Sequence, residues 1–313
     1  MKFYIGITDG KWFEYLKQLQ PDEVNFWRPS ARTAFRVIEP GAPFLFKLHK
    51  PNDFIVGGAF FSGYSRVPIS TAWDAFGQKN GAATFEEFRS AIANYREKHG
   101  LQTIDPEVGC IVLSNPFFFE ESDWIESPAD WAPNLVQGKS YEDTTEIGQS
   151  IWAEVSAKIF GVQPQIAKKV VRETRSSEGP VLGNQYLRTA RLGQGAFRLM
   201  TLENYDRRCC ITGETTVPVL EAAHIQPVAQ EGGHSLQNGL LMRADMHILY
   251  DRGLLGIDAD FRIRVSSQIR EQYLNGKVYY AHEGEQLRSL PKSEALWPSR
   301  DLLKWRMEEM FVA

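Results

Sequence analysis

The stretch CCITGETTVPVLEAAHIQPVAQEGGHSLQNGLLMRADMHILYDRGLLGI, residues 209–257, holds the clearest pattern in this chain of 313 residues. Its apolar spacing predicts a strand VPVLEAAHI that ends in His224, a loop that contains glycine, a short strand GLLM, and a helix RADMHILYDRG that Gly253 stops. A unit of strand, loop, strand and helix brings three polar residues together. These are His224, Asn238 and His247.

The polar residues of this unit have the chemistry that phosphodiester hydrolysis needs. His247 and Asp251 are one helical turn apart, so both side chains point from the same face and are able to hold one cation. A neutral histidine at the strand end, His224, takes a proton from water, and a metal stabilises charge on the scissile phosphate and on the leaving oxygen. The pattern therefore indicates a metal-dependent nuclease site.

This segment resembles the HNH endonuclease family, whose ββα-metal fold has the same order of elements. The resemblance extends over about residues 190–305, including the flanks RLGQGAFRLMTLENYDRRCCITG and DRGLLGIDADFRIRVS. It implies that His224 is the general base, that Asn238 holds the loop of the base, and that His247 is a metal ligand. It also implies a divalent cofactor, Mg²⁺ or Mn²⁺.

Two positions depart from the family pattern. Many members carry Asp or His directly before the general base, whereas this chain has Ala223 there. The missing metal ligand must come from elsewhere, and the candidates are Glu221 on the same strand and Asp251 on the helix. Many members also carry paired CxxC knuckles, but around Cys209 and Cys210 other residue types stand where the second cysteines would sit. We therefore expect no structural zinc.

The first half of the chain reads as strands and turns with one or two helices. The runs PFLFKLHK (43–50) and DFIVGGAFFSGYSRV (53–67) are separated by a turn and predict a small, strongly curved sheet or barrel with helices at its margin. The segment RSSEGPVLGNQ has the composition of a linker and follows a stretch with helical spacing. We predict an α+β fold class. The expected divisions are a first domain at 1–150, a helical linker at 151–185 and a nuclease domain at 186–313.

The run PGAPFLFKLHKPNDFIVGG, residues 40–58, together with NFWRPS before it, resembles the PUA-like superfamily and specifically its EVE-like modules. The resemblance covers about residues 1–160. It implies a small barrel whose aromatic pocket receives a modified base that has been flipped out of the duplex. The candidate pocket residues are Asn25, Trp27, Trp73 and Trp131.

An EVE-like module joined to an HNH domain resembles a modification-dependent restriction endonuclease. The implied partner is DNA that carries a modified base such as 5-methylcytosine or 5-hydroxymethylcytosine. Extruding a base costs a few kcal/mol, which stacking on aromatic walls offsets. Two alternatives stay open: an HNH endonuclease that responds to another cue such as phosphorothioate DNA, and a nucleic-acid binding or regulatory protein of weak catalytic power. A homodimer fits double-strand cleavage, which needs two active sites or two successive nicks.

The overall composition of the chain argues weakly against a nucleic-acid partner. The net charge is −4 and the pI is near 5.9, whereas phosphate binding needs clustered Lys and Arg. The acidic excess lies in residues 1–150, and the remainder is slightly basic. No apolar run approaches the ~18 residues that span a bilayer, and the start is too polar for a secretory signal. The three cysteines are too few and too unevenly spaced for a disulfide framework. These features predict a cytoplasmic protein with no membrane association.

Overall fold

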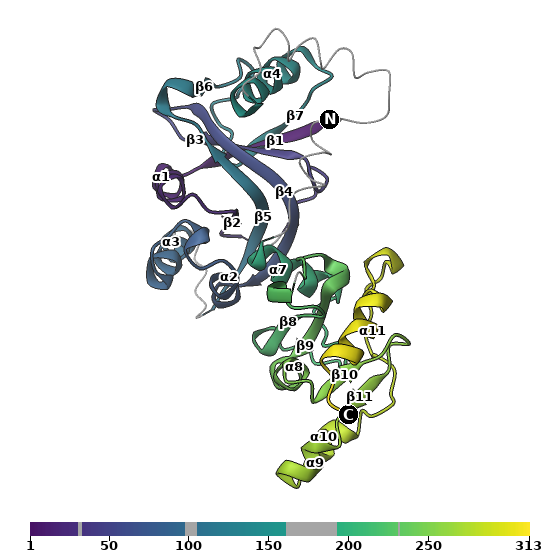
Figure 1. The fold of residues 1–313 in the computed structure, drawn as a ribbon. Coiled ribbons are helices and arrows are strands. Elements are labelled where there is room, and N and C mark those ends of the chain that lie inside the picture. The colour runs from purple at the N-terminus through teal and green to yellow at the C-terminus, as the bar shows by residue number, and fades with distance from the viewer. Residues whose placement is uncertain (31–32, 98–104, 161–192, 231) are drawn as a thin grey trace, which may run out of the picture. The chain divides into compact units, whose positions relative to one another are not determined.

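The structure, a computed structural model of the chain, describes residues 1–30, 33–97, 105–160, 193–230 and 232–313 (Figure 1). The chain divides into two compact units, Met1–Ala190 and Arg191–Ala313. None of the described helices is both long and apolar enough to cross a membrane.

The first unit is built on one mixed sheet. Its strands are β1 (Lys2–Thr8), β2 (Glu23–Arg28), β3 (Pro43–Leu48), β4 (Phe54–Pro68), β5 (Glu107–Phe118), β6 (Ile125–Glu126) and β7 (Gly138–Glu142). The strand order is β2-β5-β4-β3-β1-β7, with β6 on β4, and only the β1 and β3 pair is parallel among the described strands. Two bulges in β4 opposite β5 bend these long strands, as Figure 1 shows. Within the described ranges β2 and β7 do not pair, so the curved sheet stays open there.

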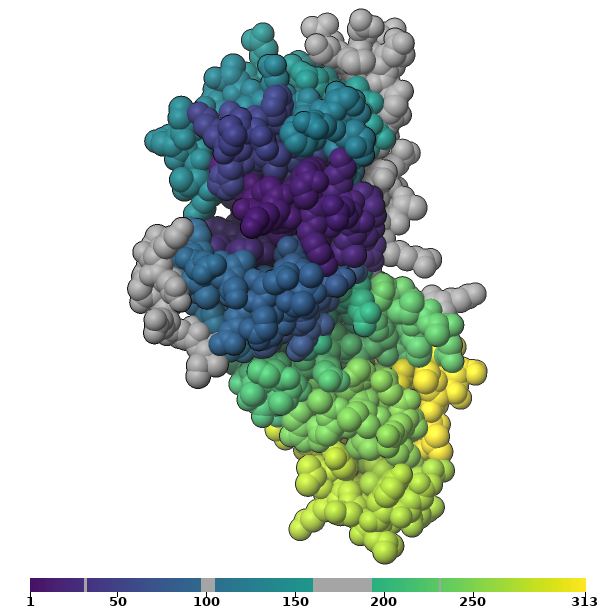
Figure 2. All heavy atoms as spheres, turned by 90° about the vertical axis from the view of Figure 1, so that its left-hand side faces the viewer, coloured from purple at the N-terminus to yellow at the C-terminus, as the bar shows by residue number. Residues whose placement is uncertain are grey.

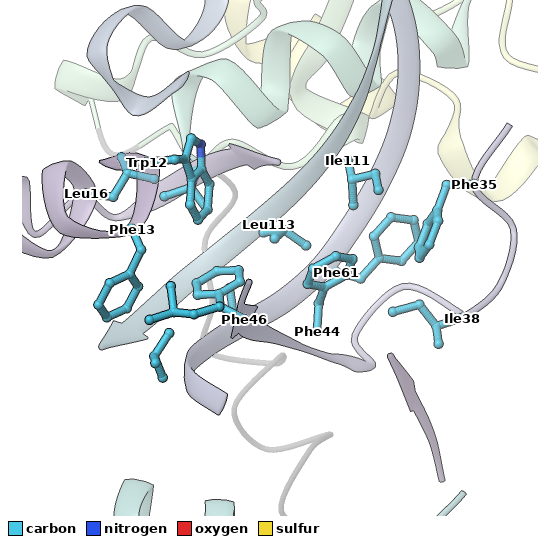
Figure 3. Close-up of a cluster of buried hydrophobic side chains, with 14 residues drawn as sticks. Trp12, Phe13, Leu16, Phe35, Ile38, Phe44, Phe46, Phe61, Ile111 and Leu113 are labelled. Atoms are coloured by element: carbon cyan, nitrogen blue, oxygen red, sulfur yellow. The ribbon is translucent and has the colours of Figure 1, made fainter. Parts of the chain in front are cut away.

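In the described residues of this unit, four helices and two 3₁₀ turns accompany the sheet. They are α1 (Gly10–Leu19), α2 (Ile69–Phe76), η1 (Gly77–Asn80), α3 (Phe85–Glu97) and α4 (Glu146–Phe160), with a further 3₁₀ turn at Glu121–Asp123. Successive side chains of a strand point to opposite faces, so β1 and β3 each contribute to two cores. On one face, Trp12, Phe13 and Leu16 of α1 pack against Phe44 and Phe46 (Figure 3).

The opposite face of the sheet is covered by α4. Ile151, Trp152 and Val155 of this helix pack against Phe3 and Ile5 of β1. Residues 151–160, which the sequence pattern assigns to a linker, are thus the last ten of the fifteen residues of α4 and belong to the fold of the first unit. The rest of the expected linker, 161–185, and the expected start of the nuclease domain lie outside the described residues.

The second unit contains the predicted order of strand, loop, strand and helix, so the α+β fold class is confirmed. Its helices and strands are α7 (Gln194–Asn204), β8 (Leu220–His224), β9 (Gly239–Arg243), α8 (Ala244–Asp251), β10 (Leu255–Ile257), β11 (Ile263–Val265), α9 (Gln268–Tyr273), α10 (Lys277–Tyr280) and α11 (Arg300–Glu309). The 3₁₀ turns are Val217–Val219, Val228–Gln230, Leu236–Asn238 and Glu294–Leu296.

Strands β8 and β9 form an antiparallel pair that α7 and α8 accompany. Helix α8 ends where the sequence predicts, because Gly253 adopts a φ of +70° and a Cβ there would lie 2.1 Å from the carbonyl oxygen of Met310. The amide of Val312 donates to the carbonyl of Gly253 at 2.9 Å. The C-terminal segment is therefore fixed against the end of α8.

Candidate functional site

His224 is the last residue of β8, and two contacts fix its ring. The imidazole stacks on Phe197 of α7 with ring centroids 4.0 Å apart and an angle of 12° between the planes. Its Nε2 lies 3.0 Å from Nδ1 of His234 in the loop that follows. The residue opposite His224 in the strand pair is Gly239, and a Cβ there would lie 3.0 Å from the Phe197 ring. Glycine at this position leaves room for the ring stack.

The surroundings of His224 keep its ring neutral. Partial burial, and then the nearby His234 and His247, lower the pKa of His224 from 6.5 to about 4. A histidine with this pKa is neutral at pH 7: one ring nitrogen carries a proton, and the other has a lone pair that accepts one. The strand end therefore presents a ring in the state that a general base requires.

The lowered pKa predicts that acid destabilises the fold. Below pH 6.5 the unfolded chain takes up a proton that folded His224 does not bind, so the free energy of unfolding falls as the pH decreases from 6.5 to about 4. We expect His224→Phe, which keeps a stacking ring but does not titrate, to lose less stability over this range. Urea denaturation of both proteins in the presence of a chelator measures the difference, and parallel pH profiles would contradict the assignment.

Asn238 ties together the two ends of the loop between β8 and β9. Its side-chain nitrogen donates to the carbonyl oxygens of Gln226 at 3.0 Å and Gly233 at 2.8 Å, and its Oδ1 accepts from the amide of Gln226 at 2.8 Å. The residue is buried, so these bonds are made away from water. They hold the backbone on either side of His234, and thereby the contact of His234 with His224.

His247 lies on α8 between two carboxylates. Its Nδ1 is 2.6 Å from Oε2 of Glu221 on β8, and its Nε2 is 3.2 Å from Oδ2 of Asp251, one turn further along α8. The carboxylate side chains stay 41% and 58% exposed, so solvent reaches the cluster. Ala223, at the position where many HNH proteins have a ligand, is fully buried and offers no donor atom.

The cluster supplies two donor atoms that could share one metal ion, but not a complete set of ligands. In the described part of the chain, no group of three or more His, Cys, Asp or Glu residues is arranged to hold a metal ion. Two ligand atoms at about 2.1 Å from one Mg²⁺ and at right angles lie about 3 Å apart. The Nε2 of His247 and the Oδ2 of Asp251 are 3.2 Å apart, which fits this geometry. Glu221 then has the position of the outer carboxylate that fixes the tautomer of a ligating histidine.

Two residues of this region escape the sequence pattern. Phe197 lies in a helix whose aromatic residue reads as ordinary core, and only the packing of α7 on the β8 and β9 pair reveals its stack with His224. Arg306 lies 82 residues beyond His224, and its guanidinium reaches the His224 carbonyl. Phe197 lies in the flank RLGQGAFRLM, which does not single it out, and no local motif marks Arg306.

A cavity of about 1350 Å³ lies in the first unit, and aromatic residues form much of its wall. The aromatic lining residues are Tyr4, Trp12, Tyr15, Phe26, Trp27, Phe35, Phe88 and Tyr95, and the charged or imidazole groups are Asp9, Lys11, Arg28, His49, Glu86 and Glu87. Its walls come from the N-terminal segment and from the region of α3, which Figure 2 shows in purple and blue on one face of this unit. The cavity has both flat apolar surfaces and polar groups.

The candidate pocket residues of β2 have different environments. Trp27 lines the cavity, and its indole nitrogen donates to the carbonyl oxygen of Asn80 at 3.0 Å. Asn25 is fully buried, and its side-chain nitrogen donates to Oδ1 of Asn80 at 2.8 Å. Asn25 thus lies behind the wall that Trp27 forms, and it supports the same η1 turn.

The other two candidate tryptophans are not among the residues that line the cavity. Trp73 of α2 packs against the rings of Phe85 and Phe88, with centroids 6.0 Å away in both cases. Trp131 has the ammonium of Lys47 at 4.9 Å from its ring centre. The structure therefore brings one of the four candidates, Trp27, to the cavity.

Comparisons with known proteins identify one segment. Residues 209–258, which include β8, β9 and α8, match the model of a family described as HNH endonuclease. This match supports a nuclease activity for the second unit. No curated protein matches the chain.

Among solved structures, the crystal structure of ASCH from Zymomonas mobilis is similar to the chain with 14% identity and a TM-score of 0.34, over 48% of this chain and 94% of that chain. A point mutant of the same protein shows 11% identity and a TM-score of 0.32, over 52% of this chain and 99% of that chain.

Proposed function

We propose that this chain is a metal-dependent DNA endonuclease whose first unit selects DNA that carries a modified base. The observation that carries the nuclease proposal is the neutral His224 at the end of β8, in the same ββα unit as the His247 and Asp251 pair. The HNH match over residues 209–258 supports the same reaction class.

Each residue of the site has a role in the proposed hydrolysis. His224 takes a proton from the attacking water; when its Nε2–H donates to His234, Nδ1 is the atom that accepts this proton. Asn238 keeps the loop of His234 in place. His247 and Asp251 would hold a divalent ion, which when bound supplies charge stabilisation for the phosphate and the leaving oxygen.

The cavity of the first unit supports the proposed choice of a modified base. An extruded base requires aromatic surfaces for stacking and polar groups for its edge. The lining supplies both, with Trp27 and Tyr4 among the aromatic residues and with His49 and Glu86 among the polar ones. A reader of phosphorothioate needs a shallow basic surface instead, whereas this lining is aromatic and mixes acidic with basic groups. The cavity therefore favours a base reader.

The experiment is a digestion of matched duplexes by the full chain with Mg²⁺ or Mn²⁺. The duplexes differ only in carrying cytosine, 5-methylcytosine, 5-hydroxymethylcytosine or a phosphorothioate linkage. We expect cleavage of a duplex with a modified base and little cleavage of the others. Equal cleavage of all duplexes would refute the sensor role, preference for phosphorothioate would establish the alternative cue, and no cleavage of any duplex would leave a binding or regulatory protein.

In the same assay Trp27→Ala is expected to remove the preference for the modified duplex. Stacking of a base on an aromatic ring contributes about 1–3 kcal/mol, so affinity for modified DNA is expected to fall by about tenfold or more. Trp131→Ala, which changes a tryptophan outside the cavity lining, is the matched control and should keep the preference. Equal discrimination by wild type and Trp27→Ala would show that Trp27 does not stack on the modified base.

A further inference from the structure

Arg306 is a buried charged residue on a helix whose other charged residues face solvent. It is 2% exposed, whereas the side chains of Lys304 and Glu308 on the same helix are 70% and 62% exposed. Burying a guanidinium carries a desolvation cost that only good hydrogen bonding offsets. An aliphatic side chain such as that of Leu303, which is also buried on α11, would fill space without that cost. The arginine therefore has a polar function that packing alone does not require.

The guanidinium of Arg306 is bonded to the end of β8. Its NH1 group donates to the carbonyl oxygen of Ile225 at 2.7 Å and to that of His224 at 3.3 Å. These are the backbone oxygens of the general base and of the residue after it. Arg306 thus ties α11 to the end of β8. These bonds fix the direction in which the chain leaves β8, and thereby the position of the His224 ring.

The same guanidinium is bonded to the end of α8. Its NH2 group donates to the carbonyl oxygen of Tyr250 at 2.6 Å and lies 3.6 Å from Oδ1 of Asp251, and its carbon lies 3.7 Å from the centre of the Tyr250 ring. The end of a helix carries partial negative charge, which a cation there stabilises. Because Oδ1 of Asp251 faces Arg306, the other oxygen, Oδ2, faces His247.

We infer that Arg306 is a positioning residue, which through one rigid group sets the distance between the general base His224 and the pair of His247 and Asp251 on α8. A guanidinium is planar, and its donors have fixed directions. NH1 bonds to the backbone of His224, and NH2 bonds to the end of α8, where Asp251 lies. This inference rests on the proposed nuclease function for its catalytic readout.

The test compares Arg306→Lys with Lys304→Ala, a control on the exposed face of the same helix. Lysine keeps the charge but not the fork of donors. A misplacement of about 1 Å costs roughly 100-fold in rate, so we expect kcat of Arg306→Lys to fall by about 100-fold with KM for DNA unchanged. Hydrogen exchange followed by mass spectrometry is expected to speed up in peptides 220–226 and 246–252, with 255–265 unchanged.

The two readouts separate the possible failures. If the wild type cuts and Arg306→Lys keeps its kcat, or if the peptides keep the exchange rates of wild type, the inference is wrong. If the wild type cuts no DNA, the proposed function fails, and the exchange rates alone then decide whether Arg306 holds the two ends. Should Arg306→Lys not fold, as judged by circular dichroism, Arg306→Gln is measured in its place at a temperature where it is folded, with the same criteria.

Discussion

Replacing His224 by alanine is expected to lower kcat for DNA cleavage by about 1000-fold, the middle of the range for loss of a general base. The reason is the state of the ring: its pKa of about 4 keeps it unprotonated at neutral pH, and its stack on Phe197 fixes the plane from which it acts. DNA affinity should stay close to that of wild type, because the change removes a proton acceptor and no cation. Single-turnover cleavage and a binding titration on the same duplex measure the two effects.

Two further variants make this result specific. His282→Ala removes another histidine, whose Nδ1 lies 3.2 Å from Glu285, away from the candidate site, and should cut at the rate of wild type. His224→Phe keeps a ring that stacks on Phe197 but has no proton acceptor, and it should be as inactive as alanine, which separates loss of the base from loss of packing. Normal cutting by His224→Ala would show that another group takes the proton.

The sequence allows the ββα segment of the second unit to be predicted well because its elements are short and consecutive. The run VPVLEAAHI is mostly apolar up to His224, a glycine-containing loop follows, and Gly253 ends the helix, so β8, β9 and α8 were predictable from local pattern. The predicted strand begins too early, because Val217–Val219 form a 3₁₀ turn before β8. The spacing of His247 and Asp251 predicts their contact, since residues one turn apart on a helix share a face.

The first unit was harder to predict for a physical reason. In NFWRPS adjacent bulky residues and a charge hide the alternation of a strand, so the sequence predicts no strand for Asn25 and Trp27, whereas both lie on β2. Whether an aromatic side chain lines a cavity or fills a core depends on partners far along the chain. Trp27 meets Asn80, and Trp131 meets Lys47, at sequence distances that no periodicity encodes.

Long-range polar contacts were beyond prediction for the same reason. Arg306 reads as one charge on an amphipathic C-terminal helix, and nothing near it marks it as buried. Its hydrogen-bond acceptors, the carbonyls of His224, Ile225 and Tyr250, are backbone atoms, which carry no sequence signature. Arg306 escaped prediction because its function depends on tertiary packing.

The cation site can be resolved by comparing Asp251→Asn with Glu221→Gln. Asp251 faces Nε2 of His247 at a distance that suits two ligands of one ion, whereas Glu221 faces Nδ1, the other ring nitrogen. Asparagine at 251 loses a charged ligand. Glutamine at 221 keeps an oxygen that accepts a bond from Nδ1. We therefore expect Mn²⁺ affinity, measured by calorimetry without DNA, to fall by about 100-fold for Asp251→Asn and by about tenfold for Glu221→Gln.

The order of these two losses is what assigns the ligand. If Glu221→Gln loses as much affinity as Asp251→Asn or more, then Glu221 binds the ion directly and Asp251 mainly pairs with Arg306, whose NH2 group is 3.6 Å from its Oδ1. Asp260→Asn, an exposed change outside the cluster, controls for the loss of one negative charge and should bind Mn²⁺ as wild type does.

His247→Ala should lose more Mn²⁺ affinity than either carboxylate variant, because the imidazole lies between the two carboxylates and contacts both. An unchanged affinity in His247→Ala would place the ion elsewhere and remove the cation from this end of α8.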